Sequence, residues 1–287
     1  MMNFQTKFRN RKGFIDPIGP SFSSAKKWKI DIEGTKIEFR APKHRPRIKL
    51  VKAEYPKKQY RYKNSDLIFR SLNKEIVVAD IWEYVRLFRH DWTFNGPWFT
   101  GCLADVTMSI LIYKSKEPNQ SISFFHPRAF EQTIGDFLTN QYSKSKTDGK
   151  HDYMAPLNWQ PINTISVPVA RLEVIADGSI SPYSKDEYLF FPIDDQHFIT
   201  FVFHPSRSAR GTEEEIDRKI GYNNLGKLID NIINSVKVTL SPEAKQQQEK
   251  ALEGLEDTSL VETFMPMKWS KSKNDTVVTN DKRIEAS

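Results

Sequence analysis

Residues 188–204 read YLFFPIDDQHFITFVFH, and this stretch predicts the centre of the fold. Residues 188–192 are expected to form one strand and residues 197–204 the next. Residues 194–196 are expected to form the turn, because short polar side chains satisfy turn backbone locally. The second strand is apolar on both faces, with Ile199, Phe201 and Phe203 on one and Phe198 and Val202 on the other. Because such strands are typical of the interior of a sheet, we expect it near the middle.

A helix and a short strand follow this hairpin. Thr212 and Glu215 have the spacing of a capping box, which predicts that the helix begins at Thr212. Its apolar stripe, loosened around residues 221–224, consists of Ile216, Ile220, Leu225, Ile229, Ile232 and Val236. The short strand is expected to end near Leu240.

The rest of the chain combines strand-like and helical patterns. The expected elements are a hairpin at 28–39, a third strand at 48–51, a strand or short helix at 75–88, a helix at 127–142 and a pair of strands at 158–177. Together they predict the α+β class: a central antiparallel β-sheet flanked by helices in an α/β/α sandwich. Two related halves are an alternative arrangement of the same elements.

The expected organisation is an irregular basic leader at residues 1–25, an α+β sandwich domain at 26–240, a surface helix at 241–257 and an extended tail at 258–287. Ser241 followed by Pro242 is a typical helix start. In the tail, the apolar residues Phe264, Met265, Met267 and Trp269 form a local patch that we expect to dock onto the body.

Charge is unevenly distributed along the 287 residues. Residues 1–70 contain 19 Lys and Arg against 6 Asp and Glu, a formal charge of +13, whereas the remainder contains 24 against 30, a charge of −6; together they give the +7 of the whole chain. A basic segment indicates an acidic partner: nucleic acid, a phosphate-rich membrane or an acidic protein. The alternative is a Lys- and Arg-rich sheet rim that only faces solvent.

The sequence also bears on the compartment. No run approaches the roughly 20 apolar residues of a membrane span, and residues 1–14 lack the apolar core of a signal peptide. Cys102 is the single cysteine, so no intrachain disulfide can form. We therefore expect a cytoplasmic protein.

Residues 86–98 form the most distinctive segment outside the central hairpin. Trp92 and Trp98 bracket an Asn-Gly-Pro turn, and Trp and Arg are typical anchors of protein interfaces. One interpretation is a β-hairpin whose aromatic side chains cap the core; the other is an exposed recognition loop. In the second interpretation the partner-binding residues are Arg86, Arg89, His90, Asp91, Trp92, Asn95 and Trp98.

The residues that could carry chemistry have structural explanations. The six histidines lack metal-ligand spacing, and Cys102 has no cysteine partner for zinc. Neither glycine-rich nucleotide-binding fingerprint occurs, nor a Gly-x-Ser-x-Gly elbow. Asp194 and Asp195 fit a turn, and residues 213–215 fit the first turn of a helix. We expect no catalytic residue, no metal and no cofactor, and therefore a binding protein rather than an enzyme.

The order of elements resembles the PsbP-like sandwich, which is also found in DcrB-like proteins. The resemblance covers residues 28–240 and is most specific at the end, in the strands at 190–203 and in the helix that ends Ile-Ile-Asn-Ser-Val-Lys-Val at 232–238. It implies a central antiparallel sheet with flanking helices and a short terminal strand.

Versions of this sandwich are similar to accessory proteins of bacterial type VI secretion clusters. The resemblance implies an immunity protein that neutralises a cognate toxin by direct binding, with an effector chaperone or adaptor as the alternative. It carries over no functional residues. A nucleic-acid-binding protein is a second class, in which basic residues 1–70 would hold the backbone and Trp28, Tyr55, Tyr60 and Tyr62 would stack on bases. An enzyme of unrecognised type and a structural or phage-derived protein are the remaining classes.

Overall fold

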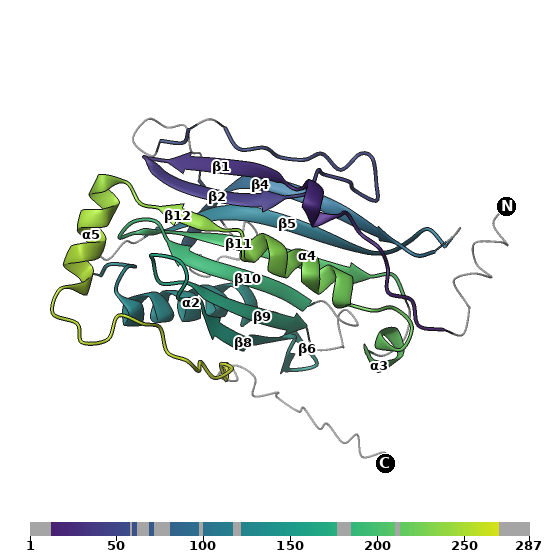
Figure 1. The fold of residues 1–287 in the computed structure, drawn as a ribbon. Helices are drawn as coiled ribbons and strands as arrows, with labels where there is room; N and C mark the ends of the chain where they lie inside the picture. The colour runs from purple at the N-terminus through teal and green to yellow at the C-terminus, as the bar shows by residue number, and fades with distance from the viewer. Residues whose placement is uncertain are drawn as a thin grey trace, which may run out of the picture.

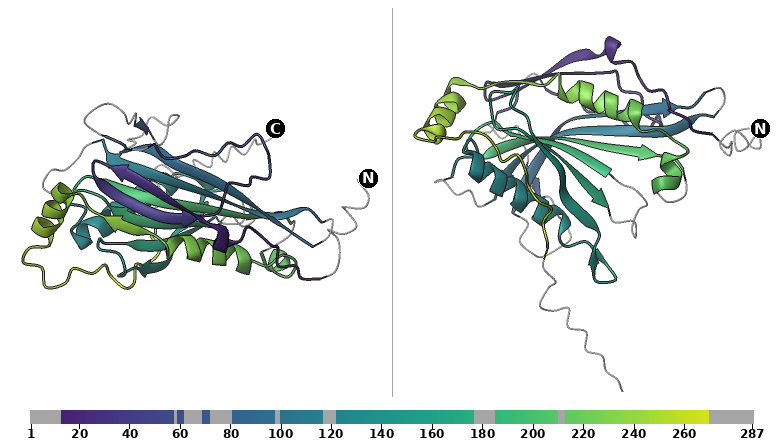
Figure 2. Two further views of the ribbon diagram at one scale, coloured as in Figure 1. Left: turned by 45° about the horizontal axis from the view of Figure 1, so that its top comes forward. Right: turned by 60° about the horizontal axis from the view of Figure 1, so that its bottom comes forward.

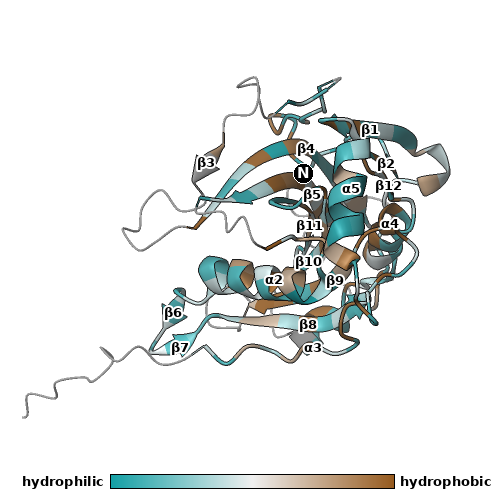
Figure 3. Cartoon of the chain, turned by 90° about the vertical axis from the view of Figure 1, so that its left-hand side faces the viewer, coloured by the Kyte–Doolittle hydropathy of each residue, from teal (hydrophilic) through white to brown (hydrophobic). Residues whose placement is uncertain are grey.

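The computed structural model describes residues 13–57, 59–61, 69–71, 81–97, 100–116, 122–176, 185–209 and 213–269. Within these ranges the main sheet has seven antiparallel strands in the order β3-β4-β5-β11-β10-β9-β8 (Figure 1 and Figure 3). Their bounds are β3 Arg70–Ser71, β4 Trp82–Asn95, β5 Cys102–Ser115, β8 Tyr153–Pro161, β9 Ala170–Ala176, β10 Lys185–Pro192 and β11 His197–Arg207. The fold is thus mostly antiparallel sheet, and the seven strands form one continuous sheet.

The hairpin predicted at residues 188–204 lies at the centre of this sheet. β11 pairs with β10 on one side and with β5 on the other. In the turn, Oδ1 of Asp194 accepts hydrogen bonds from the backbone N–H groups of Gln196 and His197, both at 2.8 Å. The five apolar side chains of β11 are buried on the two faces as expected: Phe198 and Val202 on one, Ile199, Phe201 and Phe203 on the other. The prediction of an interior strand is confirmed.

A second, three-stranded sheet has the order β1-β2-β12. Its strands are β1 Lys26–Ile32, β2 Thr35–Ala41 and β12 Lys237–Thr239. Glu33 and Gly34 form the β1–β2 turn with φ angles of 49° and 88°, a backbone that glycine adopts without strain. The N-terminal hairpin and the short terminal strand are therefore confirmed, and β12 pairs with β2 of this second sheet.

Different structures cover the two faces of the main sheet (Figure 3). Helix α2, Pro127–Tyr142, packs Phe130, Ile134 and Phe137 against one face and has the predicted bounds. The other face is covered by helix α4, Asn223–Ile233, together with the apolar side of the three-stranded sheet. This layer contains a sheet as well as a helix, because β1 and β2 have an apolar side of their own to bury.

The expected helix start, Thr212, lies outside the described residues. The rest of the helix expected up to residue 235 is divided into α3, Glu213–Asp217, and α4. Between them, the N–H of Gly221 donates to the carbonyl oxygen of Ile15 at 2.8 Å. A Cβ at Gly221 would lie 2.7 Å from Oδ1 of Asp16, so a side chain there would push the two segments apart. The interruption falls where the apolar stripe loosens, and the N-terminal segment binds there through a long-range contact that the local pattern does not show.

The third strand expected at residues 48–51 is wrong. Residues 46–53 form a loop in which Ile48 and Leu50 are 58% and 88% exposed. The stretch at 75–88, which the sequence left open between strand and helix, is a strand from Trp82 onward; residues 72–80 lie outside the described part.

Helix α5, Pro242–Leu252, begins at the predicted position. The Oγ of Ser241 accepts a hydrogen bond from the backbone N–H of Ala244 at 3.2 Å, which satisfies one of the free N–H groups at the helix start. No helix in the described part of the chain is long and apolar enough to cross a membrane.

The segment after α5 returns to the body, as expected for its apolar patch. Trp159 Nε1 donates to the carbonyl oxygen of Val261 at 2.8 Å, and the N–H of Met267 donates to that of Ala155 at 2.9 Å. Phe264, Met267 and Trp269 pack against the α2 side of the core, whereas Met265 is 72% exposed. Residues 270–287 lie outside the described part.

Candidate functional site

The predicted recognition segment is mainly a strand. Residues 86–95 belong to β4, which pairs with β5 along its length, and Trp98 lies outside the described residues. Trp92 is fully buried, and its Nε1 donates to the carbonyl oxygen of Pro42 at 3.2 Å. The expectation of Trp92 as an exposed anchor is therefore wrong, because the β1–β2 layer covers the β4 face on which it lies.

His90 is also buried rather than available to a partner. Its Nδ1 donates to the same carbonyl oxygen of Pro42 at 3.2 Å, while its Nε2 is buried without a hydrogen-bond partner among the described residues. Five rings lie within 6 Å of the imidazole, centroid to centroid: Trp28, His44, Tyr55, Phe88 and Trp92. Burial in this cage lowers the pKa of His90 to about 4.

The charged residues of the segment are bound to groups within the protein. The Asp91 carboxylate is largely buried and accepts hydrogen bonds from Thr107 Oγ1 at 2.6 Å and from Nε and Nη2 of Arg89, both at 3.3 Å. Arg86, 39% exposed, forms a two-point ion pair with Glu54. The structure therefore spreads the predicted contact residues over buried and exposed positions instead of one surface.

Asn95, the remaining described candidate, is partly exposed at the end of β4. Its backbone exchanges two hydrogen bonds with Ile18, at 2.8 and 2.9 Å. Asn95 thus fixes the N-terminal segment to the main sheet.

The outer side of the three-stranded sheet carries a cluster of cations, which we call the basic face; Figure 2 (left) turns this side toward the viewer. It consists of the exposed side chains of Lys27, Lys29, Lys36, Arg40 and Lys237, with Asp31 and Glu38 between them. Lys29, Glu38 and Lys237 lie opposite one another across the three strands. Five cations against two carboxylates leave an excess of three positive charges.

The pKa of Glu38 reflects the positive potential of the basic face. Its Oε2 lies 2.9 Å from Nζ of Lys27, and this hydrogen bond lowers the pKa of the carboxyl group. The charges of Lys27, Lys29 and Lys237 act in the same direction. The face therefore favours a negative group placed on it.

The positive surface continues into residues 43–57. Every Lys and Arg of that stretch is exposed: Lys43, Arg45, Arg47, Lys49, Lys52 and Lys57. Its one carboxylate, Glu54, is bound by Arg86. Of the tyrosines predicted to stack on bases, Tyr55 is 55% exposed and stacks on Trp28 at 5.4 Å, Tyr60 is buried, and Tyr62 lies outside the described residues.

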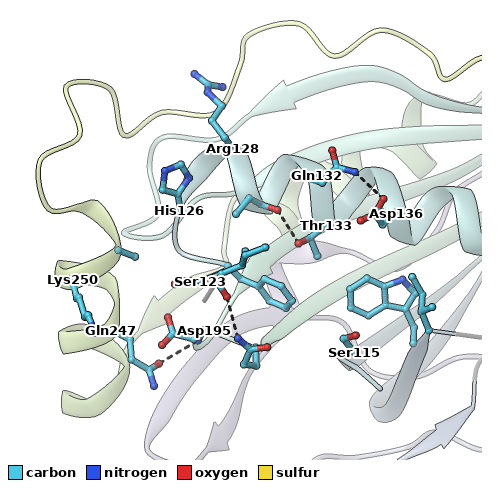
Figure 4. A pocket seen from close by; sticks show the side chains of 17 residues that line it. Ser115, Ser123, His126, Arg128, Gln132, Thr133, Asp136, Asp195, Gln247 and Lys250 are labelled. Carbon is cyan, nitrogen blue, oxygen red and sulfur yellow. Dashed lines mark hydrogen bonds between the residues drawn. The ribbon is translucent and has the colours of Figure 1, made fainter. Parts of the chain in front are cut away.

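A cavity of about 790 Å³ lies between α2, α5 and the β10–β11 turn (Figure 4). Apolar side chains line part of it, among them Trp82 and Phe124. Its polar wall consists of Ser115, Ser123, His126, Arg128, Gln132, Thr133, Asp136, Asp195, Gln196, Gln247 and Lys250. These residues come from elements far apart in sequence, so no local motif predicts the cavity.

Several polar groups in this wall hold backbone or one another. Ser123 Oγ accepts a hydrogen bond from the N–H of Phe125 at 3.1 Å, and Gln247 Oε1 accepts one from the N–H of Asp195 at 3.2 Å. Nδ1 of His126 is buried without a partner in the described part of the chain. The hydrogen bond that Ser123 Oγ accepts from Phe125 holds the chain at the start of α2.

Across the described ranges, no group of three or more His, Cys, Asp and Glu side chains is placed to hold a metal ion. No family model, no curated protein and no solved structure matches this chain.

Proposed function

We propose that this chain is a non-catalytic binding protein whose basic face holds an acidic partner protein. The observation that supports the proposal is the set of five exposed cations on one side of a hydrogen-bonded sheet. Neighbouring strands lie about 4.8 Å apart, so these charges are fixed close together and repel one another. Carboxylates of a partner would relieve that repulsion and would speed association by electrostatic steering.

The partner class follows from the resemblance to PsbP-like and DcrB-like sandwiches. The proposal includes a more specific description of the fold: an α/β/α sandwich in which the three-stranded sheet is added to one of the two helical layers. The partner would be a toxin or effector with an acidic surface, and the chain would act as an immunity protein. Direct binding would neutralise the toxin by covering its active site or holding its shape.

Charge reversal on the basic face tests this proposal. The variant carries Lys27→Glu, Lys29→Glu and Lys237→Glu. The matched control carries Lys150→Glu, Lys245→Glu and Lys268→Glu, at exposed positions outside the three-stranded sheet. All three proteins are used to capture partners from cells that produce the chain. An acidic protein retained by the wild type and the control, and lost by the basic-face variant, is the expected result.

The purified partner then supplies two further measurements. Its affinity should fall at least about tenfold for the basic-face variant, the size expected for several rim charges together. Expression of the partner alone should stop growth, and co-expression of the chain should restore it. Identical capture by all three proteins would contradict the proposal.

A second candidate function is binding of single-stranded nucleic acid. Tyr55 favours it: its ring is 55% exposed, is held in place by stacking on Trp28, and lies among exposed cations, where it could take an unpaired base. The probe is a fluorescent oligothymidine, measured at several salt concentrations. Binding that falls steeply with salt and weakens about tenfold in Tyr55→Ala would support this function; no binding at low salt would exclude it.

A further inference from the structure

We propose that the loop at residues 46–53 docks onto an anionic membrane surface and inserts Ile48 and Leu50 among the lipids. This inference goes beyond the proposed function, because it uses a different set of residues and a different class of partner. Either proposal can fail without the other.

The base of the loop is held firmly against β4. The N–H of Arg45 donates to the carbonyl oxygen of Asp91 at 2.8 Å on the entering side. On the returning side Glu54 and Arg89 exchange two backbone hydrogen bonds of 3.0 Å, and the Arg86–Glu54 ion pair lies beside them. The loop therefore leaves and rejoins the body at fixed points.

The loop is also held internally. The N–H of Val51 donates to the carbonyl oxygen of Ile48 at 3.0 Å, which closes a turn. His44 Nδ1 accepts a hydrogen bond from the N–H of Asp91 at 2.9 Å, so its Nε2 carries the proton and donates to the carbonyl oxygen of Val51 at 3.0 Å. Arg47 Nη1 donates to Ser208 Oγ at 2.9 Å. Residues 47–50 are thus presented by a preformed turn, and little order has to be gained on binding.

The tip exposes two aliphatic side chains between cations. Ile48 is 58% exposed, and Leu50, at 88%, has the highest exposure among the large hydrophobic residues that the structure describes. Arg47, Lys49 and Lys52 next to them are exposed, and no carboxylate lies between residues 46 and 53. The tip is therefore both apolar and positively charged.

This combination fits a lipid surface better than the other acidic partners. Hot spots of protein interfaces are enriched in Trp, Tyr and Arg, whereas Leu is under-represented. Nucleic acid would contact the cations but would leave Ile48 and Leu50 in water. The boundary between headgroups and acyl chains accepts aliphatic side chains, and anionic headgroups attract Lys and Arg beside them.

The basic face adds positive charge on the same side of β4. Its five cations belong to the sheet that covers one face of β4, the strand to which the base of the loop is bound. Electrostatic attraction to an anionic surface falls off within a Debye length, about 8–10 Å at ordinary ionic strength. Only cations close to the bilayer when the tip is inserted would contribute.

The test is sedimentation of the full chain with vesicles. One set contains phosphatidylcholine alone, and the other contains phosphatidylcholine mixed with phosphatidylserine. We expect binding to the mixed vesicles, weaker at high salt, and little binding to phosphatidylcholine alone. The variant Ile48→Ser/Leu50→Ser should lose about tenfold or more in affinity for the mixed vesicles.

The control is Met265→Ser, which removes a 72% exposed apolar side chain from the C-terminal segment and should leave vesicle binding unchanged. Equal thermal melts of all variants show that folding is intact. Absence of binding to mixed vesicles would overturn the proposal, and so would equal binding by the loop variant. Failure of the acidic-partner proposal would instead show as partner capture that the basic-face variant leaves unchanged.

Discussion

Nη2 of Arg171 lies 2.6 Å from Oε2 of Glu187, whose side chain is 2% exposed. The other carboxylate oxygen, Oε1, accepts a hydrogen bond from the hydroxyl of Tyr222 at 2.6 Å. The pair joins β9 and β10, and Asp230 extends it to α4 through a contact of 2.8 Å with Arg171. This buried network therefore fastens the α4 layer to the main sheet.

We predict that Glu187→Ala destabilises the protein by roughly 3–5 kcal/mol, because it removes one carboxylate partner of a partly buried guanidinium and the acceptor of the partly buried Tyr222 hydroxyl. Asp230 keeps one contact with Arg171, so the lower end of that range is expected. The control is Glu214→Ala, whose exposed pair with Arg218 should contribute less than about 1 kcal/mol. Urea denaturation measures both; equal small losses would show that the network does not stabilise the fold.

The second prediction concerns pH and His90. Burial lowers the pKa of this imidazole from 6.5 to about 4 in the folded state. Between those pH values the unfolded chain binds a proton that the folded chain does not, so stability falls as pH falls from 6.5 toward 4. The loss due to His90 should be of the order of 1–3 kcal/mol, and it is absent above pH 7.

His90→Phe isolates this contribution. Phenylalanine fills the aromatic cage without a titrating group. The carbonyl oxygen of Pro42 loses the hydrogen bond from His90 but still accepts the one from the indole N–H of Trp92. Denaturation curves of both proteins at pH 7.5 and pH 4.5 give the two pH dependences. The variant should lose less stability on acidification than the wild type; parallel curves would mean that other groups carry the acid sensitivity.

The third prediction places Phe201 at the centre of the core. Its ring is fully buried and packs edge-on against Phe39 at 5.3 Å, which joins the main sheet to the three-stranded sheet. Phe201→Ala should cost roughly 3–5 kcal/mol. Phe14→Ala, at a 59% exposed ring, is the matched control and should change stability by less than about 0.5 kcal/mol. A loss below about 1 kcal/mol at Phe201 would show that the core closes without its ring.

Local periodicity was sufficient for much of the fold. The hairpin at 188–204, the helix Pro127–Tyr142 and the hairpin at 28–39 each have a pattern that specifies both the element and its buried side. Sequence could not show that the β1–β2 hairpin covers one face of the main sheet, because that contact joins segments far apart in the chain. The same limit applies to the contact between Gly221 and Ile15, although the loosened apolar stripe did mark the interruption between α3 and α4.

The candidate site was harder to predict, for reasons visible in particular residues. Phe88, His90, Trp92 and Phe94 occupy every second position, a spacing that places them on one face of a strand. In the structure all four side chains are buried. The sequence left two interpretations open, a hairpin whose aromatic side chains cap the core and an exposed loop at the Asn-Gly-Pro turn, and the burial of Trp92 agrees with the first. In contrast, the apolar residues at 48–51 suggested a strand, whereas their hydrogen bonds close a turn and leave Leu50 in water.

The last prediction separates a core role of Trp92 from an interface role. Trp92→Ala should cost roughly 3–5 kcal/mol of stability, because the indole is fully buried. Trp92→Phe retains most of the ring volume and loses the hydrogen bond to Pro42, so a cost of about 1 kcal/mol is expected. The carbonyl oxygen of Pro42 is not left unsatisfied, since His90 still donates to it.

Thermal melts and partner binding are measured on the same two variants. Because the cations of the basic face lie on the outer side of the three-stranded sheet and Trp92 lies beneath it, the folded Trp92→Phe protein should bind the acidic partner as tightly as the wild type. Arg89→Ala serves as a comparison from the same strand that reaches solvent, with 31% of its side chain exposed. A Trp92→Phe protein with an unchanged melt and a tenfold weaker partner affinity would return Trp92 to the binding surface, and the basic face would then be the wrong surface.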